Sequence, residues 1–529
     1  MTLRSFTTLL LVFLACVGVA FVISVVVLRR YQRAVVRSMA ERISSPGTAA
    51  LPRTAINPPA RPLGFVTTRA EAAAAAERGR RFRLDEPRKT ALVYLVSGVC
   101  FALAMFLITF RTYEAAYVGR AAMLVWSLSW PAMMVWKPVS GVGWRGWWAG
   151  VAVYFAIGVT IVAAHSALFP ADRFVSSRLG MAGSLWAAFN WGMTAAVPFL
   201  MARRVRAVGV LVLAAAVLAS LGALAAVKSQ QAANLVVVAA VAAGALGWPA
   251  LAGISLLYNR RLISDESLYV DAIWLLYGAM TAMFRWDQGL SVVLPAAIVP
   301  FAVFKLVSHA GFAWLGRGSA PPCKLLLLRV FALGDRSRQL FRALAVPWRY
   351  DGPIRLITGP DLATETVEPN EFLDFIGRRL TKHFIDSDAT LDQRVRELES
   401  RPDFDGRYRV EELFCHDDTW TAALGALIRG DHLVLMDLRS FSPLNRGCIY
   451  EVEELLNLVP LPRMMFVVDG TTDEMFLKAT LTDAWARLDA DSPNRDALEP
   501  RVRLFRLDRI NSRTIRRLAS DLLQPASRF

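Results

Sequence analysis

Long apolar runs dominate the first three fifths of the chain, and no run of comparable length follows residue 316. Nine runs are long enough to cross, as helices, a hydrocarbon core about 30 Å thick. Length and pattern predict membrane spans near residues 8–28, 90–110, 118–136, 147–165, 180–201, 207–227, 233–257, 267–284 and 289–308. The expected fold class is therefore a polytopic α-helical membrane domain followed by a water-soluble domain.

The spans divide the chain into four predicted segments. They are a first transmembrane helix (1–29), a basic cytosolic loop (30–89), a helical membrane domain of about eight spans (90–316) and a cytosolic α/β domain (321–529). Within the loop, the Pro-, Ala- and Ser-rich stretch 45–62 favours disorder. Residues 71–83 favour a helix with a basic end, either lying along anionic lipid or forming a solvated linker.

The formal net charge of +16 comes from the membrane part. Residues 321–529 hold 30 Lys and Arg against 33 Asp and Glu, so the basic excess lies beside the apolar runs. This distribution is typical of topology-setting charge and of contact with anionic lipid, not of a domain that reads nucleic acid. We therefore expect the lipid bilayer as a partner, with anionic lipid at the basic loop, and no nucleic acid.

Loop charge also predicts the orientation. If the first span runs inward, the cytosolic loops carry 21 Lys and Arg and the outer loops carry 7. This bias places the N-terminus outside and the C-terminal domain in the cytosol. The five scattered cysteines form no CxxC pair, which fits a reducing compartment for the soluble part. We expect a multi-pass protein of the bacterial cytoplasmic (inner) membrane.

From Lys324 onward, short apolar runs alternate with segments of helical period. The strand candidates are Leu325–Leu333, Pro353–Thr358, Val410–Cys415, His432–Leu438, Met464–Asp469 and Val502–Leu507. The helix candidates are Ser337–Leu344, Glu371–Phe384, Thr419–Arg429, Cys448–Leu458, Asp473–Leu488 and Ser512–Leu523. Alternation implies parallel strands joined by right-handed crossovers. We expect a flavodoxin-like, doubly wound α/β domain that binds ligands beyond the carboxyl ends of its strands.

Three motifs in this domain resemble, in order, those of TIR (Toll/interleukin-1 receptor) domains. Arg329–Arg338 looks like the opening strand, loop and helix of that family. Gly359-Pro360-Asp361-Leu362 stands where TIR domains place a long loop after the second strand. The strand His432–Leu438 leads through Ser440-Phe441-Ser442 to Gly447-Cys448-Ile449-Tyr450-Glu451, which is similar to the serine and the Trp-Cys-x-x-Glu helix start of the family, with Gly447 in place of tryptophan.

The resemblance implies an output domain that cleaves NAD or assembles with its own copies. Glu451 matches the glutamate of the active-site cleft in NAD-cleaving members, where a carboxylate stabilises the oxocarbenium-like state of the ribose. The loop residues that the resemblance places toward the nucleotide are Asp335, Arg336, Gly359, Asp361, Ser440 and Ser442. NAD would be a substrate, and no cofactor is expected. Alternatively, Glu451 is one of the acids that favour the first turns of a helix.

Other polar motifs allow a structural or a chemical interpretation. Asp437 and Arg439, at a strand end, either contact a phosphate or pair with each other. Cys415-His416-Asp417-Asp418 lacks a second His/Cys cluster, so no metal site is predicted. Asp271, near one end of the eighth span, is interpreted as an interfacial residue rather than a proton carrier. Gly141–Gly146 matches GxGxxG but lies between two spans, without the strand that a dinucleotide site needs.

The sequence leaves three functions open. The first is an inner-membrane protein that senses or anchors through its membrane part and signals through a TIR-like cytosolic domain, by NAD cleavage or by forming homo-oligomers. The second is a non-catalytic scaffold or nucleotide-signal binder of the same fold. The third is a transporter with a regulatory domain, which the scarcity of charge within the spans disfavours.

Overall fold

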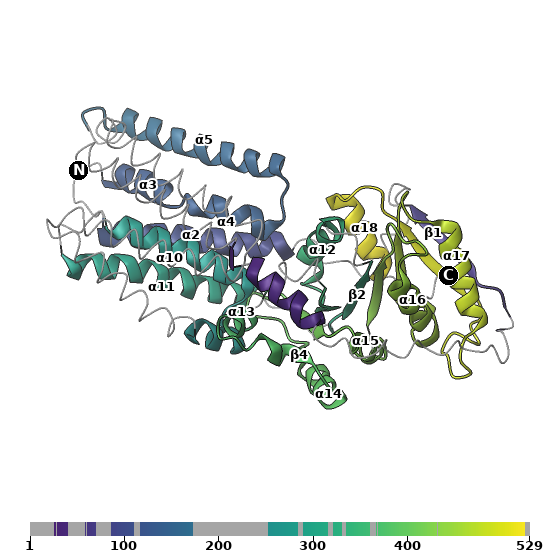
Figure 1. Ribbon diagram of the computed structural model, residues 1–529. Coiled ribbons are helices and arrows are strands. Elements are labelled where there is room, and N and C mark those ends of the chain that lie inside the picture. Colours follow the sequence, from purple (N-terminus) through teal and green to yellow (C-terminus); the bar gives the residue numbers. More distant parts are fainter. Residues whose placement is uncertain are drawn as a thin grey trace. The chain divides into compact units, whose positions relative to one another are not determined.

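In a computed structural model, the chain forms two compact units (Figure 1). The residues that the structure describes are 26–27, 29–40, 59, 61–69, 86–109, 117–172, 252–283, 289–315, 321–330, 335–359, 367, 369–430 and 432–523. The helical unit comprises Met1–Arg29, Pro87–Arg317 and Val367–Leu373. The α/β unit comprises Arg30–Glu86, Gly318–Thr366 and Asp374–Phe529.

The helical unit contains helices that are apolar on their outer faces as well as on their packed faces. They are α2 (Glu86–Thr109), α3 (Tyr117–Leu128), α4 (Pro131–Ser140), α5 (Trp144–Leu168), α10 (Asp265–Met283) and α11 (Leu290–Trp314). In α2, Tyr94 and Phe101 are buried while Leu92 and Leu103 are exposed. Among the described residues, three helices are long and apolar enough to cross a membrane: α2, α5 and the Ser291–Trp314 part of α11. A helix that is apolar all round, and not wholly covered by protein, is suited to lipid.

The described residues support three candidate spans, not the full predicted count of nine. The helices α2, α5 and α11 match the second, fourth and ninth predicted spans, and α10 lies at the eighth but is not among the three candidates. The third predicted span, 118–136, is divided into α3 and α4 at Pro131, because proline has no N–H to continue a helix. Four predicted spans lie wholly or mostly outside the described residues. Those wholly outside are 180–201 and 207–227, and those mostly outside are 8–28 and 233–257.

In the described chain, the α/β unit is built on one sheet of eight parallel strands. The alternating pattern predicted parallel strands, and six of these eight. The strands are β1 (Gly64–Arg69), β2 (Leu325–Arg329), β3 (Ile354–Ile357), β4 (Phe384–Ile385), β5 (Val410–Cys415), β6 (Leu433–Asp437), β7 (Met464–Val468) and β8 (Arg501–Arg506). Their order across the sheet is β1-β8-β7-β6-β2-β3-β5-β4. At its centre β2 pairs with β6 in register from Leu325 opposite Leu433 to Arg329 opposite Asp437.

Helices cover both faces of the sheet because alternate strand residues point to opposite sides. Leu326 and Leu328 join the core formed with α15 (Trp420–Ile428), α16 (Arg446–Leu458) and α17 (Glu474–Ala486). Leu325 and Leu327 join the core formed with α12 (Asp335–Trp348) and α18 (Ser512–Leu523). Figure 1 shows α12 and α18 on one side of the sheet and α15 and α16 on the other.

The insertion between β3 and β5 differs from its prediction. The predicted helix Glu371–Phe384 is instead α13 (Pro369–Ile376), a 3-10 turn (Leu380–His383) and β4, and α14 (Asp388–Glu397) follows. Arg378 has a positive φ of 57°, and a left-handed residue of this kind ends an α-helix.

Part of the predicted basic loop belongs to the α/β unit. Strand β1 pairs with β8 from Gly64 opposite Arg501 to Arg69 opposite Arg506, and Phe65 packs against the core. Residues 29–40 are helical, with Tyr31 buried against Phe375 at a ring-centroid distance of 5.3 Å. The α/β unit therefore extends beyond the predicted range 321–529 and includes these parts of the loop.

Candidate functional site at the carboxyl edge of the sheet

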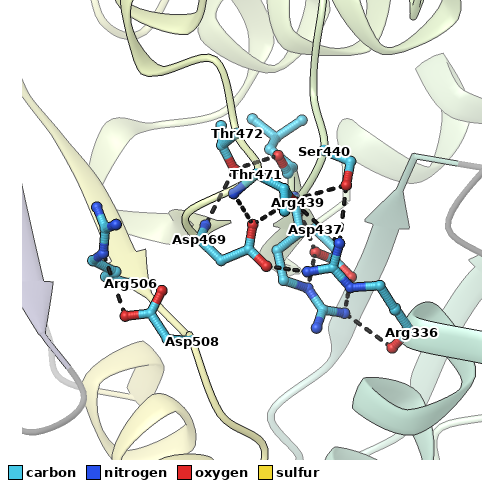
Figure 2. A network of polar contacts seen from close by, with 10 residues as sticks. Arg336, Asp437, Arg439, Ser440, Asp469, Thr471, Thr472, Arg506 and Asp508 are labelled. Atoms are coloured by element: carbon cyan, nitrogen blue, oxygen red, sulfur yellow. Dashed lines mark hydrogen bonds and ion pairs between the residues drawn. The ribbon is translucent and has the colours of Figure 1, made fainter.

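The strand order reverses between β2 and β6. The chain proceeds from β2 to β3 on one side, and later returns to β6 on the other side of β2. In open α/β sheets the crevice beyond the carboxyl ends of the strands, at such a reversal, is where ligands bind. The start of α12 and the loops that leave β6 and β7 meet there, and Figure 2 shows the polar network that they form.

Asp437 and Arg439 pair with each other. Arg439 donates from Nε to Asp437 Oδ1 at 2.7 Å and from Nη2 to Oδ2 at 2.6 Å, and both side chains are buried. Arg439 Nη2 also donates to the carbonyl of Arg336 at 3.0 Å. A two-point contact of this kind fixes the position of both groups. The pair therefore holds the β6 loop against the start of α12, and the phosphate interpretation of these two residues is not needed.

Arg336 lies across the ends of β6 and β7. Its Nη1 donates to Ser440 Oγ at 3.0 Å and to Thr471 Oγ1 at 3.2 Å, and its Nη2 forms an ion pair with Asp469. The Ser440 and Thr471 hydroxyls are themselves 2.9 Å apart. The Arg336 side chain remains 39% exposed, so this guanidinium is both positioned by protein and accessible from water.

The backbone conformation of Ser440 determines the direction of its side chain. Its φ of 59° lies in the left-handed region, which is uncommon for a residue other than glycine and is often found at functional loops. This turn directs the Ser440 hydroxyl toward Arg336, as Figure 2 shows.

Glu451 does not face an open surface. It lies in the second turn of α16, beyond the first turn where the helix dipole favours acids, and is 2% exposed. Its Oε2 has no hydrogen-bond partner in the described part of the chain. Burial raises the pKa of this carboxyl to about 8, although the charge of Arg329 opposes the shift. At neutral pH, Glu451 is therefore mostly a neutral acid in the core.

The thiol of Cys448 lies one turn before Glu451 and is buried as well. It donates toward the carbonyl of Arg329 at 3.9 Å. Burial raises the pKa of this thiol well above its ordinary value. A thiol held protonated in this way is a poor nucleophile, so Cys448 packs the core behind the carboxyl edge.

The remaining predicted residues are not brought into the network. Asp335 begins α12 and pairs with Arg338 at 2.7 Å. The Ser442 hydroxyl and N–H both donate to Asn445 Oδ1, so Ser442 shapes the turn before α16. Gly359 is buried just after β3, and Asp361 lies outside the described residues. Of the predicted nucleotide-side residues, the structure joins Arg336 and Ser440.

Two members of the network were not predicted. Asp469 and Thr471 follow β7, and Thr471 Oγ1 donates to Asp469 Oδ1 at 2.6 Å. Their signal in the sequence was the polar run Asp469-Gly470-Thr471-Thr472 directly after a buried strand. The carboxyl ends of parallel strands lie at one edge of the sheet, so this run could be expected at the same edge as Ser440.

The segment Cys415–Asp418 contacts the helix that includes Ser38 and Met39. His416 Nδ1 lies 2.6 Å from the carbonyl oxygen of Ser38, and the Asp417 N–H donates to the Met39 carbonyl at 3.1 Å. These contacts attach residues 29–40 to the end of β5. In the described ranges, no group of three or more His, Cys, Asp and Glu side chains is arranged to hold a metal ion.

Comparisons of the chain with protein-family models, with curated proteins and with solved structures found no match. The similarity to TIR domains therefore rests on the quoted motifs alone.

Proposed function

We propose that this chain is a multi-pass membrane protein whose α/β unit is a cytosolic output domain that binds a nucleotide signal at its carboxyl edge. The observation that carries the proposal is the partly exposed Arg336 guanidinium at the reversal of strand order. Asp469 contacts this guanidinium through one oxygen, Oδ2, whereas a phosphate can offer it two oxygens and more negative charge. Arg336 itself lies in the first turn of α12, where the helix dipole favours an anion.

The strand order agrees with the family that the motifs suggest. Read from β3 through β2, β6, β7 and β8, the sheet follows the flavodoxin-like order 2-1-3-4-5. The pairs β4 with β5 and β1 with β8 extend the sheet at its two edges. The same resemblance leads us to expect that the protein signals as a homo-oligomer assembled through this domain.

The α/β unit also constrains the membrane topology. Residues 30–86, 318–366 and 374–529 belong to one compact unit, which favours one side of the bilayer for all of them. On this proposal an even number of spans separates the first of these segments from the other two. Eight spans between 87 and 317 meet this condition, and with a first span they give the predicted nine. The Lys/Arg bias of the loops then places the unit in the cytosol of a bacterium and the N-terminus outside the inner membrane.

NAD cleavage is the second candidate function, and Glu451 is the observation that favours it. A carboxyl whose pKa is strongly raised, beside a reversal of strand order, is the kind of group that active sites contain. Because Glu451 is buried, cleavage requires that the start of α16 move to admit the nucleotide. Nucleotide binding through Arg336 requires no such movement, so we place binding first.

Binding is tested with the full chain in lipid nanodiscs, using NAD as the probe in calorimetric titrations. We expect Arg336→Gln to weaken binding by roughly tenfold or more, because a hydrogen bond to a charged group contributes about 1.5–3 kcal/mol. The matched control is Arg338→Gln, two residues along the same helix and outside the network of Figure 2. Equal affinities of the two variants would refute the site at Arg336.

Cleavage is tested separately in the same preparation by following NAD over time after enforced clustering. Loss of NAD that Glu451→Gln abolishes would establish the enzyme. If NAD stays intact in the wild type while Arg336-dependent binding persists, the protein is a binder and the catalytic hypothesis is wrong.

A further inference from the structure

Lys305 places a charge deep inside a candidate membrane span. The predicted ninth span ended at residue 308, which left this lysine near its end. In the structure the apolar helix continues to Trp314, and Lys305 lies about 4 Å from the middle of Ser291–Trp314 at 1.5 Å per residue. A charge at such a depth costs free energy and marks, in most membrane proteins, an ion or substrate path.

The partner of Lys305 is Asp271 on the neighbouring helix α10. Lys305 Nζ donates to Asp271 Oδ2 at 2.8 Å, and both side chains are largely covered by protein. The second carboxylate oxygen, Oδ1, is buried and has no hydrogen-bond partner within the described ranges. Asp271, interpreted from the sequence as an interfacial residue, is half of an interhelical ion pair with one acceptor unsatisfied in the described chain.

Further unsatisfied polar atoms follow Asp271 along one face of α10. The indole Nε1 of Trp274 and the hydroxyl of Thr281 are buried and lack partners in the described chain. The spacing of these residues from Asp271 puts all three on the same side of a 3.6-residue helix, over about 15 Å. Buried polar groups are rarely left without a partner, and water molecules commonly supply one.

We propose that Asp271 and Lys305 form a proton-binding site through which the helical unit carries protons across the membrane. A proton that arrives from one side binds the free oxygen of the Asp271 carboxylate. Lys305 then releases one Nζ proton toward the other side. The proton on Asp271 then passes to the neutral Lys305 amine and restores the ion pair. One proton has entered and one has left, and the pair has returned to its first state.

The surroundings of the pair suit this cycle. One turn further along α11, His309 also interacts electrostatically with Lys305. The neighbouring walls are aromatic: Trp274 packs on Phe304 at 5.3 Å and on Phe101 at 4.7 Å between ring centroids. Apolar walls strengthen the interaction between the two charges of the pair.

The test measures proton flux in liposomes that contain the full chain. A pH gradient is imposed, the membrane potential is clamped with potassium and valinomycin, and an internal dye reports pH. We expect wild-type protein to dissipate the gradient faster than protein-free vesicles, and Asp271→Asn to return the rate to that of protein-free vesicles. A wild-type rate equal to that of protein-free vesicles would overturn the proposal.

Two further variants separate chemistry from folding. The double variant Asp271→Asn/Lys305→Met removes both charges and leaves no unpaired ion, so it keeps the fold; persistent flux in this variant would also overturn the proposal. Asp172→Asn removes a carboxylate from the Arg120–Asp172 ion pair of the same unit, whose N–O distance is 2.6 Å. We expect this matched control to conduct protons at the wild-type rate.

Discussion

Each of the two units buries an aspartate beside a cation, but the two aspartates differ in how many of their carboxylate oxygens accept a hydrogen bond. In the α/β unit, Arg439 contacts both oxygens of Asp437 and uses a remaining N–H on the Arg336 carbonyl. In the helical unit, Lys305 contacts one oxygen of Asp271 and leaves the other without a partner in the described chain.

The difference follows from the geometry of the two cations. A guanidinium is a planar fork that matches a carboxylate at two points, whereas an ammonium is a single point of charge. A buried ion pair is tolerated when its hydrogen bonds are satisfied. The pair of Asp437 therefore fixes a loop, while the pair of Asp271 retains an acceptor that can take part in chemistry.

The largest expected effect concerns the Asp437–Arg439 pair, in which both carboxylate oxygens accept hydrogen bonds. Arg439→Met leaves the Asp437 carboxylate buried and uncompensated, and we expect a loss of about 3–5 kcal/mol in the free energy of unfolding of the α/β unit. Pulse proteolysis of the full chain in detergent, across a urea series, measures it. The double variant Asp437→Leu/Arg439→Met should recover most of the loss. If the single variant cost less than about 1 kcal/mol, the pair would not be buried as the structure has it.

The second prediction concerns how Glu451, a buried carboxyl in the core of the same unit, affects the free energy of unfolding. The pKa of Glu451 is about 8 in the folded protein, against 4.5 as its ordinary value. Between these two pH values the folded state holds a proton that the unfolded state has lost, so Glu451 lowers stability progressively as pH rises. Glu451→Gln removes this penalty, and we expect it to stabilise the unit by about 3 kcal/mol at pH 7.

The pH series provides the control for Glu451→Gln. Below about pH 4.5 the wild-type side chain is protonated in both states, so the difference between the two proteins should vanish there. The free energies of unfolding of both proteins, measured at each pH, give the curve. A stabilisation that did not change with pH would indicate a packing effect instead of a buried acid.

The α/β fold was largely predictable from the sequence because its signals are local. Apolar runs of strand length, such as His432–Leu438, end at polar turns, and the six predicted strands are all present. The two unpredicted strands had weaker signals. β4 has only two residues, and β1 is a short run beside Pro-rich sequence far from the rest of the sheet. Pairing partners distant along the chain decide such segments, not their own residues.

The sites were less predictable, because they depend on contacts between segments distant in sequence. The position of Arg336 after β2 and of Ser440 after β6 followed from strand ends, but Asp469 joins them from a third loop. The burial of Glu451 depends on how α16 packs. The ion pair of Asp271 with Lys305 depends on α10 and α11 lying side by side, which the sequence alone did not indicate.

A smaller effect tests where the α/β unit begins, and thus which residues share its aqueous side. Phe65 of β1 is partly buried against the sheet core, so Phe65→Ala should destabilise the α/β unit by about 2 kcal/mol, below the range for a fully buried phenylalanine. The same proteolysis assay measures it. Thr67→Ala on the same strand is the control, since Thr67 is exposed. Equal stability of both variants with the wild type would remove β1 from the unit.

The smallest effect concerns Glu453, two residues beyond Glu451 on the same helix. It pairs with Arg487 at 2.9 Å, with about a third of each side chain exposed. Water and salt screen such a pair, so Glu453→Gln should cost less than about 1 kcal/mol, and the loss should shrink further in 1 M salt, where the Debye length is about 3 Å. Unfolding at low and high salt, compared with Glu451→Gln, measures it. Glu451 and Glu453 lie on the same helix, and each has an arginine as its charged neighbour. If replacing Glu451 stabilises the unit at pH 7 and replacing Glu453 destabilises it, burial accounts for the difference. A large cost for Glu453→Gln that salt left unchanged would mean that the outer face of α16 is covered in the working protein, as it would be in an oligomer.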